Sequence, residues 1–263
     1  MIPNLIYIYC ISNGPSELGD KLKSAGIQSL AVENFYVFLK YVPESEYSED
    51  NFKRNLSNIS WLETNAREHV GVISELMEQN TVIPFKFGTI FLSEESLRKF
   101  ISDYSDSLTD NFQHLKNMEE WSVKIYCDLK ALSIKIDELS EETAALEKQI
   151  MASSPGKAYL LKRKKTDLIE NEMDRICKNY GQDYFNEFAN LSEATGLNNL
   201  LPKDFTGRED TMILNAVFLV HSKNVTDFNH TKDMLTEKYG NFGFNIEITG
   251  PWPPFSFISI KEK

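Results

Sequence analysis

Apolar residues in the first part of the chain follow a strand period in some stretches and a helix period in others. Asn4–Ser12 (NLIYIYCIS) is rich in β-branched and aromatic residues and ends at Asn13-Gly14-Pro15, which predicts a buried strand and then a turn. A short helix fits residues 16–24. The stretch 31–42 (AVENFYVFLKYV) predicts a hairpin with its turn at Glu33-Asn34.

A longer amphipathic helix is predicted after this hairpin. Ser60 is its candidate N-cap, with Glu63 three residues later as in a capping box. Pro84, in the run TVIPFKFGTIF that follows, predicts an edge strand or an irregular one. Two short helices are expected near 93–102 and 107–118, so this part has approximately the order β-α-β-β-α-β. The residues expected on the buried face of the long helix are Leu62, Ala66, His69, Val70, Ile73 and Met77.

The second part begins with another strand, Glu119–Leu129, in which apolar residues alternate with polar or half-polar ones. We place the domain boundary just before it. The chain is therefore predicted to form an N-terminal α+β domain over 1–118 and a C-terminal domain over 119–263.

The most regular feature of the sequence is a heptad pattern. Leu129, Leu132, Ile136, Leu139, Thr143, Leu146 and Ile150 are spaced by three and four residues in turn. Ser153–Gly156 then ends the predicted helix, and a second helix is expected over 157–179. We interpret the pair as an antiparallel helical hairpin within residues 129–180 of a monomer. A regulatory coiled-coil protein that dimerises through 129–150 is the alternative.

Gly181 is expected to interrupt the second helix, and Gly196 to cap a shorter one. A strand over 208–222, a helix over 225–240 and a strand over 242–250 follow, and the last apolar residues, 255–262, are a possible final strand. The second domain thus also has the order βαββαβ, the ferredoxin-like plan, with the helical hairpin inserted.

The composition fits a folded soluble protein, with 41% hydrophobic and 25% charged residues in 263. The net charge of −11 argues against nucleic acid as a partner, because phosphate backbones need a basic surface. Cys10, Cys127 and Cys177 are odd in number and far apart, which predicts reduced thiols and a cytoplasmic location. We expect no secretory leader and no membrane span, since no apolar run approaches ~18 residues.

The residue types that commonly catalyse reactions or bind metals do not occur in this sequence at the spacings typical of such sites. His69, His114, His221 and His230 have no partner at metal-ligand spacing, and glycine-rich nucleotide motifs are absent. We interpret His69 as a core histidine with satisfied hydrogen bonds. No catalytic, cofactor-binding or metal-binding residue is assigned and no cofactor is expected, although an enzyme with dispersed site residues remains an alternative.

One basic segment stands out in this acidic chain. Residues 157–165 (KAYLLKRKK) hold five cations and no acid. They are either a docking surface for an acidic partner or a solvated helix face that balances the acidic helix across the hairpin. The candidate partner-binding residues are Lys157, Lys162, Arg163, Lys164 and Lys165.

Six blocks of sequence carry a resemblance that covers nearly the whole chain. They are LIYIYCIS, WLETNAREHVGVI, VIPFKFGTIFLSEESL, SSPGKAYLLKRK, MILNAVFLV and ITGPWPPFSFI, and in this order they resemble the GvpL/GvpF family of gas vesicle proteins. Three positions depart from the family pattern: Cys10 replaces a usual Gly, Val70 follows His69 so that the family's His-Glu pair is absent, and Phe255 replaces a common Tyr. The matching motif positions, expected to be structural, are Pro84, Phe87, Gly88, Gly156, Tyr159, Gly250, Pro251, Trp252, Pro253 and Pro254.

The resemblance implies a non-enzymatic accessory or minor structural protein of gas vesicles, located at the vesicle or in the cytoplasm. Its implied partners are the small hydrophobic shell protein and other accessory proteins. The implied fold is two α+β domains, the second of modified ferredoxin-like type with added helices. An F-like and an L-like role both remain open.

The closing stretch Thr249–Phe257 (TGPWPPFSF) is apolar, aromatic and free of charge. Gly250-Pro251 breaks the strand, and Pro253-Pro254 enforces extended backbone around Trp252. We expect this stretch to pack on the second domain and fix its last strand; a partner-binding tip is the alternative.

Overall fold

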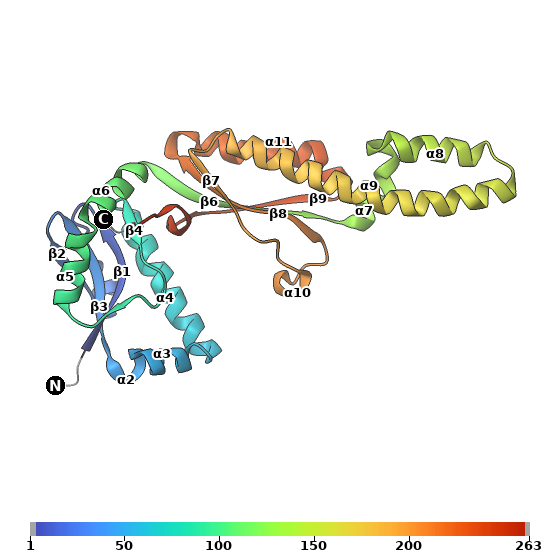
Figure 1. The fold of residues 1–263 in the computed structure, drawn as a ribbon. Coiled ribbons are helices and arrows are strands. Elements are labelled where there is room, and N and C mark those ends of the chain that lie inside the picture. Colours follow the sequence, from blue (N-terminus) through green and yellow to red (C-terminus); the bar gives the residue numbers. More distant parts are fainter. Residues whose placement is uncertain (1–3, 261–263) are drawn as a thin grey trace. The chain divides into compact units, whose positions relative to one another are not determined.

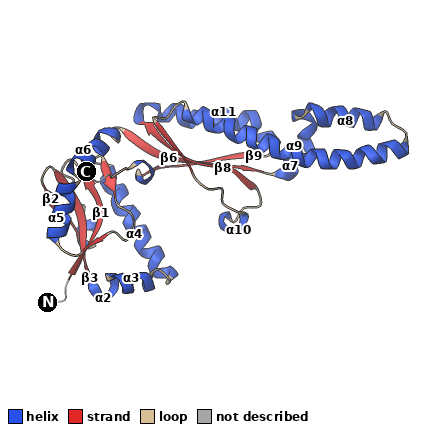
Figure 2. Ribbon diagram, in the orientation of Figure 1, coloured by secondary structure: helices blue, strands red, loops and turns tan. Residues whose placement is uncertain are grey.

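The computed structural model describes residues 4–260, which divide into two compact units (Figure 1). Of these residues, those up to Glu120 and those from Pro251 onward form the first unit, and Trp121–Gly250 forms the second. Each unit mixes helices with one sheet (Figure 2), which confirms the α+β class.

The first unit is built on a sheet with the strand order β2-β3-β1-β4, and β5 also pairs with β1. β1 is covered on both faces, which agrees with its continuous apolar run. Glu33 has a left-handed φ of 53° in the predicted two-residue turn between β2 and β3. The elements are β1 (Asn4–Ser12), α1 (Asp20–Ser24), β2 (Ile27–Val32), β3 (Phe35–Pro43), α2 (Glu44–Tyr47), α3 (Glu49–Asn55), α4 (Ile59–Met77), β4 (Val82–Pro84), β5 (Ile90–Phe91), α5 (Glu94–Asp103) and α6 (Ser105–His114).

The N-cap of the long helix α4 lies two residues before the predicted capping position. Asn58 is its N-cap, and the Asn58 side chain accepts a hydrogen bond from the Trp61 amide at 3.2 Å. Ser60 already lies inside the helix, so the predicted cap was wrong. His69 and Ile73 of the predicted apolar face are buried.

The second unit holds a sheet with the strand order β7-β8-β6-β9. The helices α9 and α11 lie side by side on one face of this sheet (Figure 1). The core between them is rich in aromatic residues, of which Phe188, Phe218 and Phe228 are fully buried. The elements are β6 (Met118–Cys127), α7 (Leu129–Leu139), α8 (Glu141–Met151), α9 (Pro155–Ala189), β7 (Ala194–Leu197), α10 (Lys203–Thr206), β8 (Thr211–His221), α11 (Val225–Tyr239) and β9 (Phe244–Trp252), with 3₁₀ turns at Ser222–Asn224, Gly240–Phe242 and Phe255–Phe257.

Two glycines in this unit do not end helices as predicted. Helix α9 runs through Gly181 without a break. Gly181 faces the sheet, where an added Cβ would lie 3.2 Å from the Ile213 carbonyl oxygen. Close helix–sheet packing there explains a glycine inside a helix. Gly196 lies in strand β7, where an added Cβ would lie 2.9 Å from Val217 Cγ2, so it is not a helix cap.

The closing stretch differs from its prediction in partner and in conformation. The backbone amide and hydroxyl of Ser256 donate hydrogen bonds to the buried Glu120 carboxylate at 2.9 and 2.7 Å. The Ser259 amide donates to Asn111 Oδ1 at 3.0 Å, and Asn111 Nδ2 donates back to the Ser259 carbonyl at 2.9 Å. Glu120 and Asn111 belong to the first unit, and so do Ser256 and Ser259, whereas the prediction had assigned the stretch to the second domain. Residues 255–257 form a 3₁₀ turn instead of a strand, and the end of that predicted strand, 261–262, lies outside the described residues.

Candidate interaction site on the helical hairpin

The heptad residues of the second unit face another helix of the same chain. Helices α7 and α8 pack against α9 and form a hairpin (Figures 1 and 2). Five of the heptad residues are buried, as the predicted hairpin requires, while the monomer stays a prediction. They are Leu132, Ile136, Thr143, Leu146 and Ile150.

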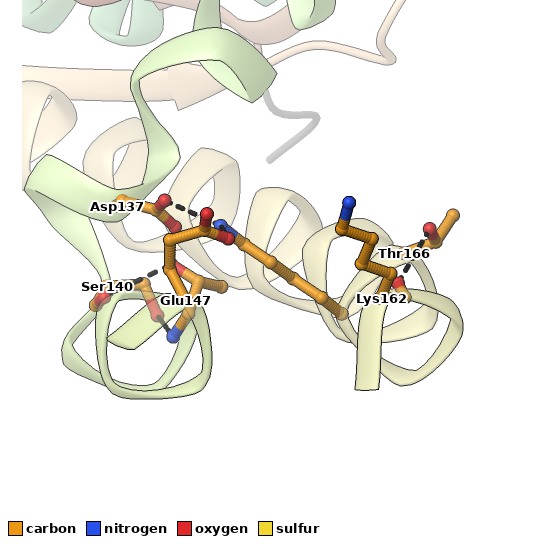
Figure 3. Close-up of polar contacts among 7 residues, drawn as sticks. Asp137, Ser140, Glu147, Lys162 and Thr166 are labelled. Atoms are coloured by element: carbon orange, nitrogen blue, oxygen red, sulfur yellow. Dashed lines mark hydrogen bonds and ion pairs between the residues drawn. The ribbon is translucent and has the colours of Figure 1, made fainter. Parts of the chain in front are cut away.

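The predicted single helix over the heptads is in fact two helices that meet at Ser140. Ser140 has φ −124° and ψ 113°, which is extended backbone, and its hydroxyl accepts a hydrogen bond from the Thr143 amide at 3.3 Å (Figure 3). Ser140 therefore caps α8. The Thr143 hydroxyl donates to the Ser140 carbonyl at 3.1 Å, so the one polar heptad residue stabilises the break between the helices.

Lys165 connects all three helices of the hairpin. Its Nζ lies 2.6 Å from an Asp137 carboxylate oxygen and 2.8 Å from Glu147 Oε2 (Figure 3), and its side chain is only 13% exposed. Burial alone would lower the pKa of Lys165, but the hydrogen bonds to Asp137 and Glu147 outweigh it and the pKa is raised. Lys165 is thus occupied inside the hairpin, as the alternative of a charge-balancing helix face predicts.

The other four cations of the basic segment point to solvent. Lys157, Lys162, Arg163 and Lys164 are exposed, and none of them forms an ion pair with another residue of the described range 4–260. Figure 3 shows Lys162 with no contact to Asp137 or Glu147; its carbonyl accepts a hydrogen bond from the Thr166 hydroxyl at 3.2 Å. The hairpin therefore separates one structural cation from four that are available to a partner.

Two large apolar side chains lie among these free cations. Tyr159 is 71% exposed and Leu160 is 67% exposed. On a helix, residues four apart are neighbours, so Tyr159 lies beside Arg163 and Leu160 beside Lys164. We call the surface formed by Lys157, Tyr159, Leu160, Lys162, Arg163 and Lys164 the basic-apolar tip. Its chemistry suits a partner surface that combines apolar side chains with carboxylates.

Replacing Lys165 with methionine is expected to lower the free energy of unfolding by about 1–2 kcal/mol. The substitution keeps an apolar stem but leaves Asp137 and Glu147, each about a third exposed, close together without their shared cation. Lys162→Met, the same change at an exposed position on α9, should stay within about 0.5 kcal/mol of wild type. Urea denaturation followed by circular dichroism measures both; equal effects would show that the Lys165 contacts contribute nothing to stability.

The histidine that lies on the face of α4 has no free ring nitrogen. His69 Nε2 donates to the Phe85 carbonyl at 2.9 Å, because a carbonyl can only accept, and Nδ1 therefore accepts from the Tyr7 hydroxyl at 2.8 Å. Burial lowers the pKa of His69 below its ordinary value, and the hydrogen bond to Phe85 opposes this only in part. His69 is a neutral core residue, as interpreted. Within residues 4–260, no group of three or more His, Cys, Asp or Glu side chains is arranged to hold a metal ion.

Motif residues that are distant in the sequence meet around His69. The Phe87 ring centroid lies 5.7 Å from the His69 ring, and the Phe255 ring stacks on it at 6.2 Å. The Gly88 amide donates to the Tyr7 hydroxyl at 3.3 Å. Pro84 pairs with Cys10 at the adjacent sheet edge. The motif residues of the first unit are thus structural neighbours.

The remaining motif positions differ in burial. Pro253 and Pro254 are buried, whereas Pro251 and Trp252 are exposed, and Gly250 has a φ of 145° at the end of β9. Gly156 and Tyr159 lie in the exposed first turns of α9. Sequence reasoning missed Glu120 and Asn111, which hold the closing stretch; a carboxylate beside an apolar strand pattern was the only signal for Glu120.

Comparison with known proteins gives consistent matches along the chain. The family model described as "Gas vesicle synthesis protein GvpL/GvpF" matches residues 5–259. Gas vesicle protein L of a Streptomyces species is 26% identical over 222 residues, 84% of this chain and 79% of that protein. Gas vesicle protein F of a Nostoc species is 23% identical over 228 residues, 81% of this chain and 83% of that protein.

Solved structures agree in fold. The crystal structure of GvpF from Anabaena superimposes with a TM-score of 0.69 at 20% identity, covering 98% of this chain and all of that one. GvpF from Microcystis aeruginosa gives a TM-score of 0.64 at 18% identity, covering 98% and 99%. Each helix in the described range is too short or too polar to cross a lipid bilayer.

Proposed function

The chain belongs to the gas vesicle synthesis protein GvpL/GvpF family, and from this premise we propose that it is a non-enzymatic accessory or minor structural protein of gas vesicle assembly. Its proposed partner is the small hydrophobic shell protein, with other accessory proteins as further partners. We place it in the cytoplasm and at the vesicle, as a monomer in dilute solution. Membership in the family supports the gas-vesicle role itself.

The observation that carries the binding part of this proposal is the basic-apolar tip. A shell subunit that must polymerise exposes apolar surface and strand edges before assembly, and such surfaces aggregate. Tyr159 and Leu160 offer apolar area to cover them, while Lys162, Arg163 and Lys164 attract carboxylates and increase the rate of encounter. A soluble chain with a charge of −11 would also keep the covered subunit dispersed.

The heptad residues support a monomer rather than the coiled-coil alternative. Leu132, Ile136 and Leu146 are buried within the second unit, so they offer little apolar surface to a second chain. A zipper dimer would require the hairpin to open. Sedimentation of the full chain at micromolar concentration tests this point.

We also infer that the second unit is a modified ferredoxin-like domain of residues 119–250. Its element order is strand, helices, two strands, helix, strand, and its sheet order is β7-β8-β6-β9. In this plan the first and last strands of the unit lie beside each other and the hairpin is an expansion of the first helix. The first unit has the equivalent sheet order, β2-β3-β1-β4.

Reversing three charges of the tip is expected to weaken binding to the shell protein about tenfold or more. The variant is Lys162→Glu, Arg163→Glu and Lys164→Glu, all at exposed positions, so the fold should be retained. The measurement is co-purification of the tagged chain with the co-expressed shell protein, followed by a titration. The difference in affinity between wild type and variant should decrease at high salt, because salt screens the electrostatic attraction to the partner.

The matched control is Lys21→Glu, Lys23→Glu and Lys116→Glu, which changes the net charge equally at exposed positions of the first unit. This control should bind as wild type does. If the tip variant and the control retain the same amount of shell protein, the tip is not the binding surface. If wild type retains none, the proposed function itself is wrong.

A further inference from the structure

A second surface, on the first unit, has the properties of a binding site and lies outside the proposed function. It is an open hollow of about 410 Å³, which is within the size range of ligand pockets. Its apolar lining comes from two strands and from the short helices α2 and α3. These apolar residues are Leu5, Tyr47, Phe52, Ile90 and Leu92.

Two of the residues that line this hollow, Tyr47 and Phe52, belong to a cluster of packed aromatic rings. The Phe52 ring lies 5.7 Å from Trp61 and 5.8 Å from Phe87, and the Tyr47 ring lies 5.7 Å from Trp61. The Tyr47 hydroxyl donates to Asn65 Oδ1 at 2.9 Å. Because these rings hold one another in place, the hollow exists before any partner binds, which lowers the entropic cost of binding.

Leu92 lies at the edge of the hollow with 80% of its surface exposed. Single exposed apolar residues are common and need no explanation. Leu92 differs because it continues the apolar lining outward, so that an inserted side chain would contact Leu5, Ile90 and Leu92 together. The hollow therefore suits one or two aliphatic or aromatic side chains.

The charge at the rim selects the kind of partner. Glu44 and Glu49 line the hollow, and residues 44–50 (ESEYSED) hold four carboxylates and no cation. Among the described residues that line the hollow the cation is Lys53, which pairs with Glu49 at 2.6 Å in an exposed ion pair. A rim of this kind attracts cations, and it opposes phosphates, anionic lipid surfaces and acidic peptides.

We propose that this first-unit hollow binds a basic amphipathic segment of a partner protein. The apolar side chains of the segment enter the hollow, and its flanking lysines or arginines meet Glu44 and Glu49. The charge preference is opposite to that of the basic-apolar tip. The hollow and the basic-apolar tip would therefore select segments of opposite charge.

The test uses the full chain and a fluorescein-labelled twelve-residue peptide of alternating leucine and lysine pairs. Fluorescence anisotropy measures its affinity. Leu92→Ser should weaken binding about tenfold or more, since one aliphatic contact in an apolar site contributes about 10- to 200-fold. Glu44→Lys with Glu49→Lys should weaken it by about tenfold as well. A peptide with serine in place of leucine should bind much more weakly, as should one with glutamate in place of lysine.

Two control variants separate the hollow from a general effect of an acidic surface. Ile59 is also 80% exposed but does not line the hollow, so Ile59→Ser should bind as wild type does. Glu78→Lys with Asp110→Lys makes the same charge change at exposed positions elsewhere on the first unit. The proposal is overturned if Leu92→Ser binds as well as Ile59→Ser. It is also overturned if the two charge variants weaken binding equally, or if the serine peptide binds as tightly as the leucine peptide.

Discussion

Replacing His69 with alanine is expected to lower the free energy of unfolding of the first unit by about 3–5 kcal/mol. The side chain is 1% exposed and lies among the rings of Tyr7, Tyr9, Phe87 and Phe255. Its removal creates a cavity and also leaves the Tyr7 hydroxyl and the Phe85 carbonyl without their buried partner. Removal of a large core ring and loss of buried hydrogen bonds are both among the largest single-residue effects.

His114→Ala is the matched control, because it makes the same change at an exposed position of the same unit. It should cost less than about 0.5 kcal/mol. Hydrogen exchange measured on peptides from β1 and α4 reports the first unit separately, which matters because the two units need not unfold together. Equal protection in the two variants would show that His69 does not support this core.

His69 also makes the stability of the first unit depend on pH. Burial lowers the pKa of His69 in the folded state, whereas in the unfolded chain it is about 6.5. Below that value the unfolded chain binds more protons, so stability rises with pH. The contribution is fully present above pH ~6.5 and is lost as the pH falls toward the folded-state pKa. His69→Gln, which cannot titrate, should therefore lose less stability than wild type between about pH 7 and pH 5.

Replacing Gly88 with alanine should cost about 2–4 kcal/mol for two separate reasons. Gly88 has a φ of +83°, where a Cβ is strained by about 1–2 kcal/mol. The new Cβ would also lie 2.5 Å from Phe52 Cζ, so the Phe52 ring, which lines the hollow, must move. Thermal unfolding measures the loss, and binding of the leucine–lysine peptide should weaken in the same variant.

Substitutions at two other glycines separate the backbone strain from the contact with Phe52. Gly207 has a φ of +65° but open space around an added Cβ, so Gly207→Ala should show the backbone strain alone. Gly71 lies in helix α4 with open space around it, and Gly71→Ala should raise stability by about 0.5–1 kcal/mol. If Gly88→Ala costs no more than Gly207→Ala, the contact with Phe52 has no energetic importance.

Elements whose signals are local were predicted well. The strand Asn4–Ser12 has the predicted bounds, and the hairpin turn lies at Glu33-Asn34, because strand patterns and two-residue turns depend on adjacent residues. The break at Ser140 was missed although Ser140 is a favoured N-cap residue, because the heptad spacing continues on both sides of it and outweighed that signal.

Predictions failed where a partner distant in the sequence decides the structure. Nothing near Gly181 indicates that it packs against Ile213, and nothing near Ser256 indicates that it bonds to Glu120. Local propensity favours a helix end at a glycine. Position in the sequence favours packing of the closing stretch on the domain that precedes it. Tertiary contacts override both preferences, because burial and hydrogen bonding have larger free energies than local propensity.

The sequence by itself determined the α+β class, local elements such as the strand Asn4–Ser12 and, through motifs spread from residue 5 to residue 259, the family. These properties follow from local patterning and from the identity of motif residues. Only the tertiary structure decided which lysines are available, because Lys165 and Lys164 are adjacent in the sequence but lie on different faces of α9. It alone also joined Leu5, Phe52 and Leu92 into one hollow, since a binding surface depends on residues that folding brings together.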